Sequence, residues 1–457
     1  MTKTYHFCGI GGSGMLPLAA IVRASGARVT GSDRALDAGR LAPKFDYLKR
    51  LGIDLFAQDG SGLQNGTTLV TSAAVESTIP DVVRAAELGL PHVTRPQLLA
   101  ELLNAATTSV AVGGTSGKST VTGMIGWMLD RTGQGPTVMN GAVMKNFVSP
   151  DAPFASALVG DPNLFVSEVD ESDGSIALYR PSVAVLGNVS LDHHGLDELR
   201  ALFGAFLSRA AIAVVNLDDP EVRAMAESLP PEHLIGFGID SPGAALSARD
   251  VALSDDGSRF CLTVAGDSHE VVLTIPGRHN IMNALAALGA VHALRQPLAA
   301  AIAALGKFAG LKRRLETVGT ANGITVIDDF AHNPDKIAAT LATLTAREGR
   351  LLVMFQPHGY GPLAKMGEEL AETFERGLRE DDRLYLPDPV YQGGTVDRSR
   401  GSDWLAARIP NATHLAERSV IGDAIVAEAK PGDTIAILGA RDDTLSEYAA
   451  EILARLG

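Results

Sequence analysis

A glycine-rich loop between an apolar strand and a helical run constrains the fold of this chain more than any other feature. The loop, residues 113–119, reads Gly-Gly-Thr-Ser-Gly-Lys-Ser, and it joins the predicted strand 109–112 to the helical run 120–130. This order is the βα unit of a parallel sheet. Backbone N–H groups in such a loop hold phosphates, Lys118 neutralises their charge and the Ser119 hydroxyl binds Mg²⁺.

The loop departs from the strict phosphate-binding motif at one position. The motif has glycine five positions before Gly117, and this chain has Val112 there. A chance glycine turn with an exposed lysine is the competing interpretation. The Gly-Lys-Ser ending still predicts an ATP site, made of Gly114, Thr115, Ser116, Gly117, Lys118 and Ser119.

A second glycine loop lies near the N-terminus. In the segment Gly9-Ile10-Gly11-Gly12-Ser13-Gly14, three glycines follow the G-x-G-x-x-G pattern between a strand and a helix. Asp33 ends the next βα unit, at the spacing of an acid that binds ribose. The loop suits NAD or any other nucleotide diphosphate, and a tight turn that needs glycine for packing is the alternative.

Strand and helix patterns recur in three blocks. The length of 457 residues suggests about three domains at ~150 residues each. We expect an α/β protein of three successive domains: a Rossmann-like domain at 1–105, a P-loop ATPase-like domain at 106–310 and a Rossmann-like domain at 311–457. The polar segment 238–267 predicts a small β excursion. The other expected strands are Tyr5–Ile10, Arg28–Ser32, Leu69–Ser72, Ser109–Val112, Leu164–Glu168, Val183–Asn188, Ala211–Asn216, Ile324–Asp328, Arg350–Phe355, Arg383–Leu386 and Thr434–Leu438.

Composition excludes several classes of protein. The chain has 39 Lys and Arg against 53 Asp and Glu, a net charge of −14, which argues against nucleic acid as a partner. Two cysteines, Cys8 and Cys261, allow neither a disulfide framework nor a Cys-type zinc site. We expect no signal peptide, and the most apolar stretch, 284–311, is broken by polar residues. We expect a cytoplasmic protein without a membrane partner, as a monomer or homodimer.

Acidic and histidine residues follow two further strands of the central block. The run Glu168 to Asp173 comes after strand 164–168, and Asp192-His193-His194 comes after strand 183–188. Carboxylates at the carboxyl ends of strands beside a P-loop can hold Mg²⁺. Taken alone, the run is more typical of a solvated loop, and a single histidine is usually not a ligand.

The order of these motifs resembles that of the Mur ligases of peptidoglycan synthesis, and most of all the branch that acts on UDP-N-acetylmuramate itself. The match runs through almost the whole chain. Its segments are His6 to Met15, Gly31 to Asp33, Thr71 to Ala74, Gly114 to Ser119, Glu168 to Asp173, Asn188 to His193, Gly277 to Ala284, Arg313 to Glu316, Asp328 to Pro334, and Gln356 to His358.

The resemblance implies two nucleotide sites. Residues for the UDP-sugar are Gly11, Gly12, Ser13, Gly14, Met15, Asp33 and Ser72. Four residues join the P-loop in binding ATP: Asn280 and Asn283 at the adenine, and Arg314 and Asp329 from the third domain. Spacing alone equally favours a capped helix start for the two asparagines, and an exposed basic linker is the alternative for Arg313 and Arg314.

The resemblance also implies a metal site and an acceptor site. Ser119, Glu168 and His193 would bind Mg²⁺. The amine would meet Phe330, His332, His358 and Tyr360. The catalytic set is Lys118, Glu168, His193 and His332.

The implied reaction is the ATP-dependent joining of the UDP-N-acetylmuramate carboxylate to an amine through an acyl phosphate. Lys118 and Arg314 would stabilise the transferring phosphoryl group, and His332 would accept the amine proton or orient the amine. L-Alanine is the favoured amine. Other amino acids, the recycled peptide L-Ala-γ-D-Glu-diaminopimelate and a non-catalytic nucleotide-binding relative are the alternatives. An NAD-linked dehydrogenase would explain only the first loop.

Two departures from the family pattern bear on these expectations. No lysine occurs between Lys145 and Lys307, so the carbamylated lysine of some branches is absent, as expected for the muramate branch. Gly359, Gly361 and Pro362 stand where L-alanine-adding relatives supply arginines for the amino-acid carboxylate. The sequence therefore predicts another group for that carboxylate, such as Arg441, or another amine.

Overall fold

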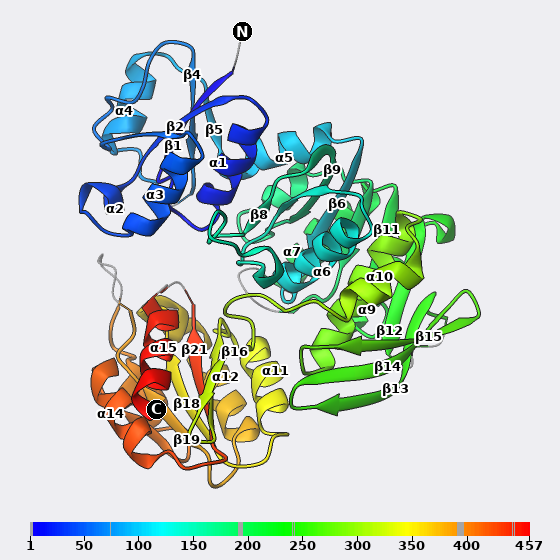
Figure 1. Ribbon diagram of the computed structural model, residues 1–457, viewed down its shortest axis with the longest axis vertical. Coiled ribbons are helices and arrows are strands. Elements are labelled where there is room, and N and C mark those ends of the chain that lie inside the picture. Colours follow the sequence, from blue (N-terminus) through cyan, green and yellow to red (C-terminus); the bar gives the residue numbers. More distant parts are fainter. Residues whose placement is uncertain are drawn as a thin grey trace. The chain divides into compact units, whose positions relative to one another are not determined.

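The computed structural model describes residues 3–73, 75–190, 195–239, 241, 243–390, 397–440, 442 and 444–457. The chain forms two compact units (Figure 1). The first unit comprises Met1–Ala252, Ser258–Ile275 and Asn280–Ala309, and the second comprises Leu253–Gly257, Pro276–His279 and Gly310–Gly457. Within the described ranges, no helix is both long and apolar enough to cross a membrane.

The first sheet is parallel and has the order β3-β2-β1-β4-β5. Its chain order reverses between β1 and β4, the point where α/β sheets of this kind bind ligands. The strands are β1 Thr4–Cys8, β2 Arg28–Ser32, β3 Asp54–Phe56, β4 Thr67–Thr71 and β5 His92–Thr94. The helices are α1 Met15–Ala24, α2 Arg34–Asp37, α3 Ala42–Arg50, α4 Pro80–Glu87 and α5 Arg95–Ala105.

The second sheet has ten strands in the order β15-β14-β13-β12-β11-β10-β6-β9-β7-β8. Its centre is parallel, and β6 lies between β10 and β9 with Val112 opposite both Val185 and Glu168. The strands are β6 Thr108–Gly113, β7 Pro136–Met139, β8 Ala157–Leu158, β9 Asp161–Glu168, β10 Val183–Leu186, β11 Ile212–Asn216, β12 Leu234–Ile239, β13 Leu246–Ser254, β14 Gly257–Val264 and β15 Asp267–Leu273. The helices are α6 Lys118–Arg131, α7 Leu196–Ser208, α8 Pro220–Ala226, α9 Arg278–Ala293 and α10 Leu298–Leu305, with short 3₁₀ turns at Lys145–Phe147, Ser175–Leu178 and Pro231–His233.

The third sheet belongs to the second unit and has the order β16-β17-β21-β18-β19-β20, with only β16 antiparallel to its neighbour. Helices cover both faces, because its central strands are apolar on both sides. The strands are β16 Glu316–Ala321, β17 Ile324–Asp329, β18 Leu351–Gln356, β19 Arg383–Leu386, β20 Ala412–His414 and β21 Thr434–Gly439. The helices are α11 Pro334–Leu344, α12 Tyr360–Gly377, α13 Ser402–Ala406, α14 Arg418–Glu428 and α15 Thr444–Leu456.

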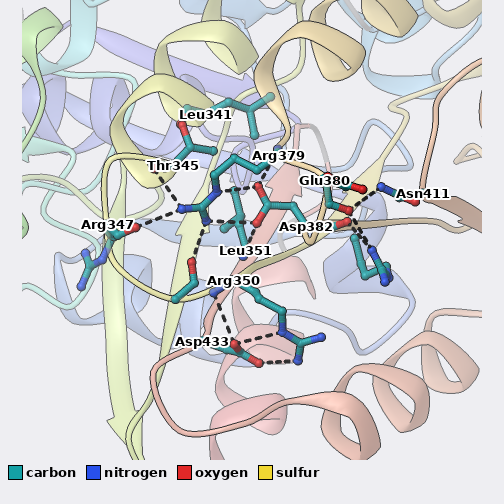
Figure 2. A network of polar contacts seen from close by, with 12 residues as sticks. Leu341, Thr345, Arg347, Arg350, Leu351, Arg379, Glu380, Asp382, Asn411 and Asp433 are labelled. Atoms are coloured by element: carbon teal, nitrogen blue, oxygen red, sulfur yellow. Dashed lines mark hydrogen bonds and ion pairs between the residues drawn. The ribbon is translucent and has the colours of Figure 1, made fainter.

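Ion pairs to two buried carboxylates secure the amino-terminal edge of this third sheet (Figure 2). Arg350, just before β18, reaches Asp433, just before β21, at 2.7 Å. Arg379 pairs with the fully buried Asp382 at 3.0 Å and donates to the Gly349 carbonyl at 2.8 Å. These contacts satisfy charges that would be costly if buried alone. The residues predicted to bind the amine substrate follow the strands at the opposite, carboxyl edge of the sheet. The ion pairs do not occupy that edge.

The structure confirms the predicted α/β class with its three parallel-sheet domains. The predicted strand at 28–32 has the same bounds in the structure, and the excursion at 238–267 contains all of β13 and β14. The sequence pattern missed several short strands, among them β3, β5, β8 and β20, which have two or three residues each.

Candidate active site

The P-loop follows β6 and opens α6, as the sequence predicts. Gly117 has a φ of 82°, and a Cβ there would lie 2.4 Å from Oδ1 of Asn283. Gly114 has a φ of 128° and lies against the backbone of Asn188. Both positions therefore need glycine for conformation and for space.

Lys118 is held inside this loop. Its ammonium lies 2.7 Å from the Gly114 carbonyl and 2.7 Å from Oε2 of Glu171. Burial disfavours the charged ammonium, but the carboxylates of Glu171, Asp170 and Glu168 outweigh it and raise the pKa of Lys118. The alternative of a chance turn with an exposed lysine is therefore wrong.

Ser119 and Glu168 meet at the end of the central strands. The Ser119 hydroxyl donates to Oε2 of Glu168 at 2.7 Å, because β9 ends beside the start of α6. A Cβ at Gly141 would lie 1.9 Å from the other carboxylate oxygen, so this glycine leaves room for Glu168. A hydroxyl and a carboxylate are oxygen donors that suit Mg²⁺, which keeps several of its waters.

The predicted metal site is only partly covered by the structure. His193 lies outside the described residues. Among the residues that are described, no group of three or more His, Cys, Asp or Glu side chains could hold a metal ion. The Ser119–Glu168 pair is thus the part of the predicted set that the structure brings together.

The acidic run after β9 is not a solvated loop. Glu171 is buried at 3% exposure, and only the far end of the run, at Asp173, is exposed. Burial would raise the pKa of Asp170, but Lys118 and hydrogen bonds from Ser172 lower it. Glu168, Asp170 and Glu171 therefore interact with P-loop residues.

Asn188 holds the P-loop by hydrogen bonds that its place in the segment Asn188 to His193 does not reveal. Its Oδ1 accepts from the Ser116 N–H and the Thr115 hydroxyl, both at 2.8 Å, and its Nδ2 donates to the Ser116 carbonyl at 3.2 Å. Ser190 also lies 2.9 Å from the Thr115 hydroxyl. The segment after β10 therefore fixes the shape of the P-loop.

One hydroxyl in the P-loop is left over. The Ser116 Oγ is buried, and it has no hydrogen-bond partner within the described part of the chain. A buried donor without a partner is costly, so a bound phosphate oxygen would relieve it. This observation fits a nucleotide in the loop.

The two asparagines predicted at the adenine lie inside α9, whose first residue is Arg278, so neither caps that helix. Asn283 donates to Asn280 at 3.1 Å and borders Gly117. Asn283 therefore reaches the P-loop, and the adenine contact stays a prediction.

Asp33 acts on the N-terminal loop itself. Its Oδ2 accepts from the Gly11 N–H at 2.9 Å, and its Oδ1 accepts from the Ala35 N–H, which caps α2. Of the other predicted residues, Gly12 and Ser13 are exposed, whereas the Met15 side chain is buried in the core. Met15 can therefore offer a ligand only its backbone, and the remaining UDP-sugar contacts, Ser72 included, stay predictions.

Arg95, the first residue of α5, was not predicted. Its side chain lies against Gly14, with Cδ 3.0 Å from where a Cβ would be. It also lowers the pKa of Asp170. Arg95 thus supplies a cation beside the N-terminal loop, and its sequence context, Thr-Arg-Pro, resembles an ordinary capped helix start.

The predicted acceptor residues gather at the carboxyl edge of the third sheet. The His332 ring lies edge-on to Phe330 and His358, at centroid distances of 5.4 and 5.0 Å. Its Nδ1 is 2.8 Å from the Phe330 carbonyl, which can only accept, so Nδ1 carries the proton. Burial, together with Lys336, lowers the pKa of His332 well below its ordinary value. The imidazole is therefore neutral, and Nε2 can accept a proton.

The neighbouring arginines divide their roles. Arg313 is 11% exposed, and it binds Asp328 at 3.3 Å and the Gly439 carbonyl at 2.8 Å, so it is not an exposed linker. Arg314 stacks over Phe330, 4.5 Å from the ring centre. Asp329 is buried, which raises its pKa, and it accepts from the Leu315 N–H. The ATP contacts of Arg314 and Asp329 stay predictions, as does the amine contact of Tyr360, which opens α12 near Arg398.

Three family models cover nearly the whole chain. They are the Mur ligase family catalytic domain at residues 4–107, the Mur ligase middle domain at 112–291 and the Mur ligase glutamate ligase domain at 313–441. The predicted domain limits of 1–105, 106–310 and 311–457 stay predictions.

Similar proteins are ligases that act on UDP-N-acetylmuramate or on murein peptides. UDP-N-acetylmuramate–L-alanine ligases from Phenylobacterium zucineum and Agrobacterium fabrum are 32% and 33% identical, over 97% and 99% of this chain and 94% and 96% of theirs. A UDP-N-acetylmuramate–alanine ligase structure from Thermotoga maritima has a TM-score of 0.78 at 24% identity, covering 99% of this chain and 98% of that one. A murein peptide ligase structure from Psychrobacter arcticus has a TM-score of 0.72 at 26% identity, covering 100% and 99%.

The fold, the P-loop and these matches define an ATP-dependent ligase. The chain belongs to the Mur ligase family, whose members act in peptidoglycan synthesis.

Proposed function

We propose that this protein joins the carboxylate of UDP-N-acetylmuramate to the amino group of L-alanine, with ATP converted to ADP and phosphate. The observation that carries the proposal is the P-loop, in which Lys118, Ser119 and Glu168 lie together at the end of β6 and β9. The full-length similarity to L-alanine-adding relatives supports the choice of substrates.

The P-loop residues suit transfer of the ATP γ-phosphoryl group to the muramate carboxylate. The Lys118 ammonium and the P-loop N–H groups would neutralise the phosphates, and the Ser116 hydroxyl would donate to them. Ser119 and Glu168 would hold Mg²⁺, which supplies charge stabilisation when bound. The product of this step is an acyl phosphate, which an amine can attack.

The second unit carries groups that suit the attack. With Nδ1 protonated, Nε2 of His332 carries the lone pair, so it can take a proton from the amino group of L-alanine as the neutral amine attacks the acyl phosphate and phosphate leaves. Lys336 and Arg314 lie close enough to lower the pKa of His332. We assign Lys336 to the alanine carboxylate, since Gly359 and Pro362 supply no cation, and Arg314 to the phosphoryl group.

The test is phosphate release with UDP-N-acetylmuramate, ATP and a panel of amines. L-Alanine should be the best substrate, ahead of glycine, L-serine and L-Ala-γ-D-Glu-diaminopimelate. Lys118→Ala should abolish release while the protein stays folded, a loss of at least ~3 kcal/mol of transition-state stabilisation. Better turnover of the peptide than of alanine would refute the proposed acceptor, and near-normal turnover by folded Lys118→Ala would refute the ATP site.

A further inference from the structure

One buried carboxylate beside the P-loop has a role that the reaction above does not assign. Glu171 is 3% exposed, and its Oε2 lies 2.7 Å from the Lys118 ammonium. A buried charge is costly to leave unpaired, so this contact is strongly favoured while no ligand is bound. Glu171 is therefore tied to Lys118, whereas Glu168, three residues earlier, is tied to Ser119.

The backbone after β9 holds Glu171 in this position. The Val169 N–H donates to the Val112 carbonyl at 2.9 Å, which keeps the chain beside the end of β6. The Gly174 N–H then donates to the Glu171 carbonyl at 3.0 Å, and Gly174 turns the chain with a φ of 73°. This turn directs the Glu171 side chain toward the P-loop.

The lysine ammonium has three N–H donors. The Gly114 carbonyl and Glu171 use two of them, each at 2.7 Å. One donor remains, and its direction is set by the other two. We propose that Glu171 is a positioning residue that aims this remaining Lys118 donor at the nucleotide phosphates, an inference that rests on the proposed ATP site.

The charge of Glu171 also opposes the nucleotide. Glu168, Asp170 and Glu171 all act on Lys118, and Arg95 acts on Asp170, so two cations stand against three carboxylates, a local balance of 2 − 3 = −1. ATP without a metal ion adds further negative charge at the same place. Removing the charge of Glu171 should therefore strengthen the binding of metal-free ATP. Removing its contact with Lys118 should slow phosphoryl transfer.

Binding and turnover should respond with opposite signs. In Glu171→Gln, metal-free ATP in EDTA should bind about tenfold more tightly by calorimetry, a conservative value for one charge at this range in a partly buried site. Glu171→Ala should lower kcat for phosphate release at least tenfold. Replacing a residue with a merely structural role would weaken ATP binding and lower kcat together.

Asp173→Asn is the matched control, because it removes one charge from the same acidic run at an exposed position that caps the Ser175 N–H. Asp173→Asn should change neither the affinity for metal-free ATP nor kcat by more than about twofold. If Glu171→Ala fails to fold, Glu171→Asp keeps the charge but shortens the reach, and it should lower kcat without tightening ATP.

The inference is overturned if Glu171→Gln binds metal-free ATP no better than the wild type, or if folded Glu171→Ala or Glu171→Asp keeps the wild-type kcat. Its failure differs from failure of the proposed function. Without an ATP site, the wild type and Lys118→Ala would bind ATP equally poorly, whatever stands at position 171.

Discussion

Replacing Asn188 by alanine should loosen the P-loop without touching a phosphate-binding side chain. The change removes three hydrogen bonds, two to Ser116 and one to the Thr115 hydroxyl. At ~0.5–1.5 kcal/mol each, their loss costs about 1.5–4.5 kcal/mol. We expect bound nucleotide to order the loosened loop, so that part of this free energy is taken from ATP binding. The KM for ATP should therefore rise roughly tenfold or more.

The assay is steady-state phosphate release, with the KM for ATP and the KM for UDP-N-acetylmuramate measured separately. Asn104→Ala is the matched control, because Asn104 also joins two segments of the first unit, through Leu178 and Arg180, but outside the P-loop. Both variants should lower the melting temperature. Only Asn188→Ala should change the KM for ATP.

A double-mutant cycle with Thr115→Val tests the contact itself. Thr115→Val removes the hydroxyl that Asn188 accepts from, so the two substitutions share one interaction and their effects should not add. The reasoning fails if Asn188→Ala raises both KM values equally, or if the two substitutions are additive in the KM for ATP.

Three further outcomes follow from the geometry. Gly117→Ala should cost more stability and ATP affinity than Gly133→Ala, since both have φ near 80° but only the first places a Cβ against Asn283 (2.4 Å); equal thermal shifts would contradict this. His332 has a lowered pKa, so the unfolded chain binds its proton first and stability falls as the pH drops below ~6.5; urea titrations should show that dependence reduced in a glutamine variant. Asp382→Ala leaves the buried Leu351 N–H without its acceptor and should cost about 1–3 kcal/mol of stability in denaturant melts, while ATP binding to the folded protein stays normal.

Local sequence patterns were enough to predict the elements that position the site. The apolar run 109–112, the glycine loop and the following helical run predict β6 and α6, because each depends on neighbouring residues alone. Strands of two or three residues, such as β5 and β8, carry too few residues for a pattern, and their pairing partners in the sheet stabilise them instead.

Long-range contacts explain what the sequence left open at the site. Glu171 and Asp173 are both acids in one run, and only the packing of the turn against Lys118 buries the first and exposes the second. Asn188 is 72 residues from Ser116 and becomes its partner because β10 and β6 are neighbours. Asp33 fits a ribose-binding position by spacing, yet its carboxylate holds the backbone of its own loop.

The hydrogen bond that fixes the His332 tautomer bears on how the choice of amine substrate can change. The hydrogen-bond acceptor is the main-chain carbonyl of Phe330. The side chain at position 330 therefore takes no part in setting which nitrogen of His332 is protonated. The Phe330 ring instead faces the imidazole and the Arg314 guanidinium. The Phe330 carbonyl thus fixes which nitrogen of His332 is protonated, whereas the ring packs against neighbouring side chains, so the side chain at position 330 can vary without changing the His332 tautomer.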